Sequence, residues 1–116
     1  MARPGGHYSH AVVGAGLVFI SGQLAIAPDG TRFSDAPFAT QARQTLANIA
    51  AALAGAGSGI GKLLNVRVYL TDIDDWTEFN TVYAEWVGNA RPARAVVPVP
   101  TLHYGFRIEI EAVALA

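Results

Sequence analysis

The sequence contains no cysteine and little charge. Of its 116 residues only 15% are charged, and the formal net charge is −1. The lack of cysteine excludes a disulfide framework and a thiol nucleophile. No basic tract is present, which disfavours a surface that follows nucleic-acid phosphates. Apolar runs are interrupted well short of a membrane span, and the Met1–Gly6 segment lacks a signal-peptide pattern. We therefore expect a cytoplasmic protein that binds neither nucleic acid nor membrane.

Apolar residues are what the sequence has in abundance, at 52% of the chain. A chain of this length forms one domain, which we place at residues 1–116. A small monomer usually presents more charge to water than this composition supplies. We therefore expect part of the surface to be covered by partner subunits.

Apolar periodicity predicts seven elements in the order β-β-α-β-α-β-β. The pattern places strands at 11–13, 17–20, 64–70, 93–99 and 107–115, and helices at 38–56 and from residue 76 to about 88. Asp75 and Glu78 resemble a capping box at the start of the second helix. This order predicts an α+β layer in which one sheet carries two helices on a single face.

The last predicted strand has two unlike faces. The even positions from Ile108 to Ala114 suit a face covered by helices, whereas the odd positions from Arg107 to Leu115 mix charge with apolar side chains. With Tyr69 and Val96 added, this second face is too apolar for open water and too charged for a plain core. We infer that subunits associate through it and that its polar groups serve a site.

Two charged residues on the predicted strands are candidates for chemistry. Arg94 lies near the start of a strand, where it could pair with Glu109 or Glu111, or clamp a substrate carboxylate with its planar guanidinium. Glu109 could be paired structurally, or it could act as a general acid or base with a pKa raised by partial burial. A neighbouring arginine would lower that pKa, so the direction of the shift stays open.

Other polar residues have simpler explanations. Tyr8, ahead of the first strand, could fill the core or line a pocket, and Ser21 could bind a ligand through its hydroxyl. Ser21 has no base and orienting partner of the serine-hydrolase kind, and the histidines form no metal-ligand cluster. Asn80, at the edge of the apolar stripe of a helix, could hold a neighbouring loop or subunit.

Seven sequence blocks together resemble the Rid (YjgF-like) family of reactive-intermediate deaminases. They follow the family order and cover nearly the whole chain: Gly6–Val12, Phe19–Gln23, Gln41–Ile49, Val68–Asp72, Phe79–Tyr83, Pro92–Val96 and Ile108–Ala112. The most specific signature is Pro-Ala-Arg at 92–94 combined with Ile-Glu-Ile-Glu at 108–111.

The resemblance implies a chorismate-mutase-like fold and a homotrimer with three sites in clefts between subunits. It also implies that the protein hydrolyses enamines and imines such as 2-aminoacrylate to 2-oxo acids and ammonia, with no metal or organic cofactor. An aminomuconate-type deaminase with the same site, or a non-catalytic trimer that binds small carboxylates, are the alternatives. A ribonuclease or translation inhibitor, as some members have been described, fits the charge balance least.

The resemblance also implies roles for individual residues. Arg94 matches the arginine that pairs with the substrate carboxylate, and Glu109 matches the glutamate associated with the attacking water. Tyr8 matches a tyrosine that lines the pocket, and Ser21 matches the serine at the end of the second strand. These four residues are therefore the expected centre of the site.

Backbone N–H groups near Gly22 and Val96 would help to bind ligand oxygen atoms if the resemblance holds. The chain departs from the family pattern at Val96, where many members carry cysteine, and at His7, where proline is common. The loop Thr101–Phe106 lacks the usual Pro-Lys pair and carries two aromatic residues. We expect these changes to lie near the pocket rim and to mark a subgroup with a bulkier or pathway-specific substrate.

Overall fold

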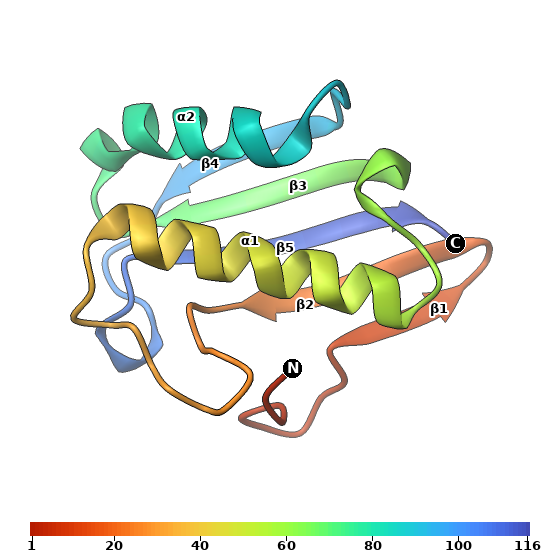
Figure 1. The fold of residues 1–116 in the computed structure, drawn as a ribbon, viewed down its shortest axis with the longest axis horizontal. Helices are drawn as coiled ribbons and strands as arrows, with labels where there is room; N and C mark the ends of the chain where they lie inside the picture. Colours follow the sequence, from red (N-terminus) through yellow and green to blue (C-terminus); the bar gives the residue numbers. More distant parts are fainter.

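The computed structural model describes residues 1–116 and contains five strands and two α-helices (Figure 1). The elements are β1 (Ala11–Gly14), β2 (Leu17–Gln23), α1 (Phe38–Gly55), β3 (Leu63–Leu70), α2 (Trp76–Val87), β4 (Ala93–Pro98) and β5 (Ile108–Leu115). Three short 3-10 turns lie at Ile60–Lys62, Ile73–Asp75 and His103–Gly105. The predicted order of strands and helices is confirmed.

The five strands form one sheet in the order β1-β2-β5-β3-β4. All neighbouring pairs are antiparallel except β3 and β4, which are parallel. A parallel pair needs a crossover connection, and α2 supplies it. Figure 1 shows α1 and α2 on the same face of the sheet. The predicted α+β layer is therefore confirmed, and the other sheet face carries no helix.

The core lies between the sheet and the two helices. Its members alternate along the strands and recur at three or four positions along the helices. The largest fully buried apolar side chains include Leu46, Ile49 and Leu53 from α1, Phe79 from α2, Leu70 from β3, and Ile108 and Ile110 from β5. Each such side chain contributes about 1.5–3 kcal/mol on burial. The even positions of β5 face the helices, as predicted.

Helix α1 ends where the glycine run predicts. Gly57 adopts a left-handed φ of 76°, and its N–H bonds the carbonyl of Ala54 at 3.0 Å. The N–H of Ser58 bonds the carbonyl of Leu53 at 2.9 Å. These two bonds form a Schellman motif, which satisfies the last carbonyls of a helix. No helix in the structure has both the length and the apolar character needed to cross a membrane.

The start of α2 differs from the predicted capping box. Asp75 occupies the cap position, but its side chain makes no cap hydrogen bond. Its carboxylate instead accepts two bonds from the guanidinium of Arg107, at 2.7 and 2.9 Å. Asp72 bonds the N–H of Asp74 at 2.9 Å and caps the preceding turn. Two charge-assisted hydrogen bonds are stronger than one bond to a backbone N–H, so Asp75 pairs with Arg107 and does not cap the helix.

Two residues lie on the opposite side of the sheet from the side predicted. Val96 pairs in register with the buried Val68 and packs against the core. Arg107 precedes β5 and turns toward the helices, where its guanidinium lies 5.3 Å from the ring centroid of Phe38. Neither residue belongs to the helix-free face. The register between β3 and β4 decides the face of Val96, and alternation within one strand does not reveal that register.

Candidate active site

An irregularity in β2 shapes the site. Ile20 pairs with Ala112 and Gln23 pairs with Ile110, so β2 has one more residue than β5 between these pairs. The extra residue forms a β-bulge at Ser21–Gly22, and a bulge redirects the side chains around it. Its position is fixed from the N-terminal side, because the N–H of Ser21 bonds the carbonyl of His10 at 2.9 Å.

The carboxyl group of Glu109 lies directly over the backbone of Gly22. A β-carbon at residue 22 would lie 2.1 Å from Oε2 of Glu109 and 3.1 Å from its Cδ, so the close approach requires glycine. Burial raises the pKa of Glu109; His103 opposes the rise and Glu111 adds to it. The pKa therefore shifts upward, the direction that the sequence left open.

An open cleft of about 510 Å³ surrounds this carboxyl group. Tyr8, Ser21, Gly22 and Glu109 all line it, so the fold brings together four of the six residues proposed from the sequence. Ser21 is itself tied down, because its hydroxyl donates to the carbonyl of Ser9 at 2.6 Å. The cleft thus joins the N-terminal segment, the bulge of β2 and the first half of β5.

The two glutamates of β5 that face this cleft have different surroundings. Glu111 accepts a hydrogen bond from the hydroxyl of Tyr69 at 2.5 Å, and Arg67 lies 3.8 Å away. This hydrogen bond is the main cause of a raised pKa at Tyr69. Glu109 has no hydrogen-bond partner within the chain, which leaves its carboxyl group available to water or a ligand. Glu111 is therefore held structurally, and Glu109 is the candidate for chemistry.

The loop between β4 and β5 also reaches the cleft. His103 and Tyr104 line its rim, so part of the departure from the family pattern lies where it was expected. No local pattern in the sequence links His103 to Glu109. The fold brings the two close enough for the histidine to lower the pKa of the glutamate. No group of three or more His, Cys, Asp or Glu side chains is placed to hold a metal ion.

Arg94 lines a second cavity, of about 400 Å³, beside α2. Its Nη1 donates to Oδ1 of Asn80 at 2.9 Å. Its guanidinium carbon lies 4.9 Å from the ring centroid of Tyr83, a cation–π contact. The Tyr83 hydroxyl is buried without a partner, and burial raises its pKa while Arg94 opposes the rise. Asn80 therefore holds the arginine side chain in place, a role that the sequence did not reveal.

Arg94 and Glu109 do not meet within one chain. Arg94 pairs in register with the buried Val66 and faces the helix layer, whereas Glu109 pairs with Tyr69 on the helix-free face. The alternative of an ion pair between Arg94 and Glu109 or Glu111 is therefore wrong within one chain. Of the six candidate residues, Arg94 and Val96 lie apart from the cleft.

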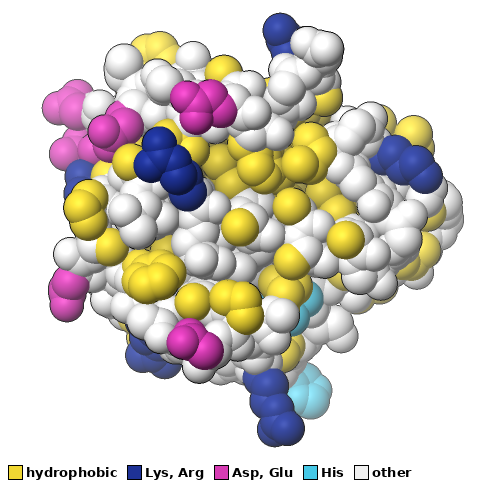
Figure 2. All heavy atoms as spheres, in the orientation of Figure 1, with side chains coloured by type: hydrophobic (Ala, Val, Ile, Leu, Met, Phe, Trp, Pro, Cys, Tyr) yellow, Lys and Arg dark blue, Asp and Glu magenta, His cyan; other side chains and the backbone are white.

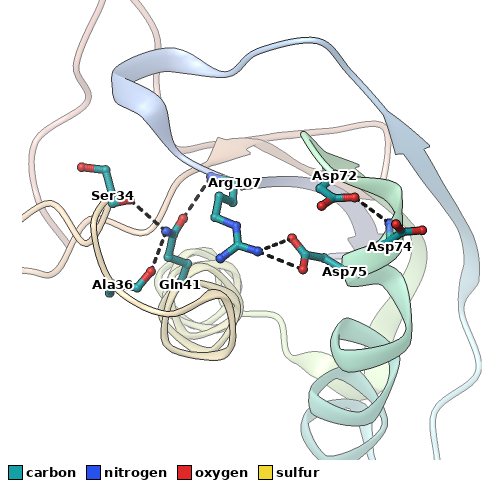
Figure 3. A network of polar contacts seen from close by, with 7 residues as sticks. All are labelled: Ser34, Ala36, Gln41, Asp72, Asp74, Asp75 and Arg107. Carbon is teal, nitrogen blue, oxygen red and sulfur yellow. Dashed lines mark hydrogen bonds and ion pairs between the residues drawn. The ribbon is translucent and has the colours of Figure 1, made fainter.

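Sequence reasoning also missed a network that fixes the start of β5 (Figure 3). The buried Gln41 of α1 donates to the carbonyls of Ser34 at 3.1 Å and Ala36 at 3.0 Å. Its Oε1 accepts a bond from the N–H of Arg107 at 3.0 Å. In the sequence, Gln41 follows Phe38 by three residues and so shares its helix face. Together with the pair between Arg107 and the start of α2, this network positions the strand that carries Glu109.

The fold and the cleft define an α+β protein whose site centres on one half-buried carboxyl group beside a bulged strand. A family model described as Endoribonuclease L-PSP matches residues 1–116. The 2-iminobutanoate/2-iminopropanoate deaminase of Bos taurus is 37% identical over 110 residues, which are 95% of this chain and 80% of the bovine protein.

Solved structures agree with this match. RidA from an Antarctic Psychrobacter species is 34% identical, with a TM-score of 0.92, covering 98% of this chain and 92% of that one. E. coli TdcF, solved with bound serine, is 32% identical, with a TM-score of 0.88, covering 96% of this chain and 89% of that one. The chain belongs to the Rid (YjgF-like) family, to which the L-PSP model corresponds.

Proposed function

We propose that this protein hydrolyses small carboxylate-bearing imines and enamines, of the 2-aminoacrylate type, to 2-oxo acids and ammonia. The observation that carries the proposal is the half-buried carboxyl group of Glu109, which has a raised pKa and faces an open cleft without a partner. A general acid or base works best when its pKa lies near the working pH, and burial moves Glu109 in that direction. The activity in the name of the bovine relative supports the same chemistry.

The positions of these groups suggest a sequence of steps. The enamine tautomerises to an imine, whose carbon is the better electrophile. Glu109 accepts a proton from water as the oxygen attacks this carbon and returns it to the nitrogen, which gives the neutral carbinolamine. It then carries the proton of the carbinolamine hydroxyl to the same nitrogen, so that ammonia can leave as the carbonyl forms. The C–N bond then breaks, so that one water is consumed for each ammonia released. Ser21 and the backbone near Gly22 line the same cleft. A backbone N–H near Gly22 would bind a ligand oxygen, and the Ser21 hydroxyl, which donates to Ser9, would accept a hydrogen bond from the ligand.

A site shared between copies of the chain would bring a guanidinium group to this cleft. Arg94 has the planar fork that binds a carboxylate, but it faces away from the Glu109 of its own chain. We propose a homotrimer in which Arg94 of one copy reaches the Glu109 cleft of the next. Phe19 and Leu115 support this, because both belong to the helix-free face and each is 47% exposed. Binding of serine, which carries a carboxylate, to TdcF is consistent with such a clamp.

Three other functions remain as alternatives to this proposal. An aminomuconate-type deaminase would use the same groups on a larger substrate, and a non-catalytic trimer would bind small carboxylates without turnover. The family description also names an endoribonuclease. The net charge of −1 does not favour binding of an RNA backbone. Figure 2 shows Arg and Lys scattered singly over the helix face, with no continuous basic patch.

An assay with 2-aminoacrylate generated in situ tests the proposal. Its loss is followed with native protein, Arg94→Ala, Glu109→Gln and the control Arg43→Ala, which alters an exposed residue of α1. Loss of a general base costs about 10²–10⁴-fold, so Glu109→Gln should fall near the background rate. No acceleration by native protein would overturn the deaminase proposal, and binding without turnover would favour the non-catalytic alternative. Equal acceleration by Arg94→Ala would overturn the carboxylate clamp.

The expected cytoplasmic location is also part of the proposal. Cell fractionation followed by detection of the protein tests it directly. Recovery from an organelle or a membrane fraction would contradict it.

A further inference from the structure

Tyr104, at the rim of the Glu109 cleft, has a backbone conformation that tyrosine rarely adopts. Its φ of 63° and ψ of 15° lie in the left-handed region, where the β-carbon crowds the backbone. A glycine there would avoid this crowding. Strained residues persist where the surrounding structure holds them, and they cluster at binding sites. The tyrosine ring therefore lies at this rim even though its position requires an unfavourable left-handed backbone conformation.

The ring of Tyr104 is held in place by its neighbours. The guanidinium carbon of Arg32 lies 3.7 Å from the ring centroid. Phe106, which is buried, meets the ring edge-on at a centroid distance of 6.2 Å. Arg32 does not line the cleft, so it supports the ring from outside. Tyr104 nevertheless remains 48% exposed, which leaves part of the ring free to contact a ligand.

Tyr8 gives the same cleft a second exposed aromatic ring. Its hydroxyl accepts a hydrogen bond from the N–H of Gly5 at 3.3 Å, and the ring of His10 meets it edge-on at 6.2 Å. Leu24 and Ile26 add aliphatic surface. The cleft therefore carries two aromatic rings and two aliphatic side chains beside the carboxyl group of Glu109.

We infer that this cleft selects 2-imino acids with a large apolar side chain, above all an aromatic one, and that Tyr104 is a specificity-determining residue. The inference rests on the proposed function, because the imine and its carboxylate are handled by Glu109 and Arg94. A substrate ring beside Tyr8 and Tyr104 gains burial and aromatic contacts that 2-aminoacrylate, with a single methylene carbon, does not make. The reaction is unchanged: an arylmethyl 2-imino acid and water give the arylmethyl 2-oxo acid and ammonia.

A comparison of two imines tests the inference. An amino-acid oxidase generates the imines of phenylalanine and alanine in situ, and kcat/KM is measured for each. Native protein should favour the aromatic imine, and Tyr104→Gly should lower the aromatic-to-small ratio by about twofold to tenfold, the value of one aromatic contact. Glycine also relieves the left-handed backbone, so misfolding does not explain the loss. Arg32→Ala should lower the ratio less, and Arg43→Ala should leave it unchanged.

Some outcomes contradict the inference directly. A native preference for the alanine imine overturns it, and so does an equal loss for both imines in Tyr104→Gly. Calorimetric binding of phenylpyruvate and pyruvate separates the inference from the proposed function. Tighter binding of phenylpyruvate than of pyruvate, lost in Tyr104→Gly, supports the aromatic wall. If no imine is turned over in that case, only the deaminase proposal is overturned. Equal binding of the two acids without turnover overturns both.

Discussion

At the scale of single residues, the candidate site depends on the absence of a side chain at Gly22. Gly22→Ala would place a β-carbon where Oε2 of Glu109 now lies. The carboxyl group ends a flexible side chain and can swing aside, so we expect little change in Tm. Displacement of a reacting group by about 1 Å can cost on the order of a hundredfold in rate, and we expect a loss of this size in the imine assay.

Gly61→Ala is the matched control for this prediction. A β-carbon at residue 61 would meet no atom within 4 Å, so both rate and Tm should stay close to native. If Gly22→Ala retains native activity, the close approach of the glutamate to the bulge does not matter for chemistry.

The raised pKa of Glu109 predicts opposite effects on activity and stability. As a base the residue must be deprotonated, so the rate should rise with pH through a pKa above the ordinary 4.5. The pKa of Glu109 is higher in the folded state than in the unfolded state. The folded state therefore loses stability as the pH rises from the unfolded-state pKa through the folded-state pKa. Glu109→Gln should therefore remove the acidic limb of the rate profile and raise Tm near neutral pH.

Thermal unfolding at two pH values checks the stability half of this prediction. Below the ordinary pKa both forms of the protein carry an uncharged group at residue 109, and the gain in Tm should disappear. A lower Tm for Glu109→Gln near neutral pH would show that the charged carboxylate is stabilised by a favourable contact.

At the scale of elements, Gln41 joins α1 to β5. Its side chain makes three hydrogen bonds while fully buried. Gln41→Leu keeps a similar size but leaves two carbonyls and the N–H of Arg107 without this partner, at a cost of about 2–4 kcal/mol. Denaturant unfolding measures the change, and Arg43→Leu, on an exposed part of the same helix, should stay within about 0.5 kcal/mol. Equal stability of the two variants would mean that water replaces the lost bonds.

The order of elements was predictable from the sequence because it depends on local periodicity. The alternation from Ile108 to Ala114 gave the correct buried face of β5, since neighbouring side chains on a strand point to opposite sides. Errors arose where a distant partner decides the outcome. The face of Val96 follows from its pairing with β3, and Asp75 is taken by Arg107, which lies 32 residues further along the chain.

The candidate site was only partly predictable for the same reason. Family resemblance pointed to Tyr8, Ser21 and Glu109, and the fold places all three on one cleft. The bulge at Ser21–Gly22 depends on how β2 pairs with β5, and no local pattern marks it. The separation of Arg94 from Glu109 likewise follows from registers on two different strands. The catalytic roles of Arg94 and Glu109 stay predictions.

At the scale of the whole molecule, the separation of Arg94 and Glu109 predicts complementation between two inactive variants. Co-expressed Arg94→Ala and Glu109→Gln chains in equal amounts should regain about a quarter of native activity, because in a cyclic assembly one interface in four then pairs an intact arginine with an intact glutamate. Each variant alone should stay near background. Light scattering should give about three times the 12.2 kDa of one chain.

Mixed assemblies that regain no activity would contradict the shared site even if the mass is trimeric. A monomeric mass for the native protein would contradict the trimer itself. The two measurements therefore separate the assembly from the arrangement of its sites.

The bulge in β2 has a consequence for protein engineering. Before it, Val18 and Ile20 lie in the core, whereas Ser21 and Gly22 line the cleft. The extra residue thus divides one strand into a part that serves folding and a part that serves chemistry. Libraries randomised at residues 21 and 22 should sample new reactivities while most clones still fold. Deletion of a single residue at the bulge, in contrast, would shift the core-forming part of β2 relative to the part that lines the cleft. A change at the cleft would then also disturb the core.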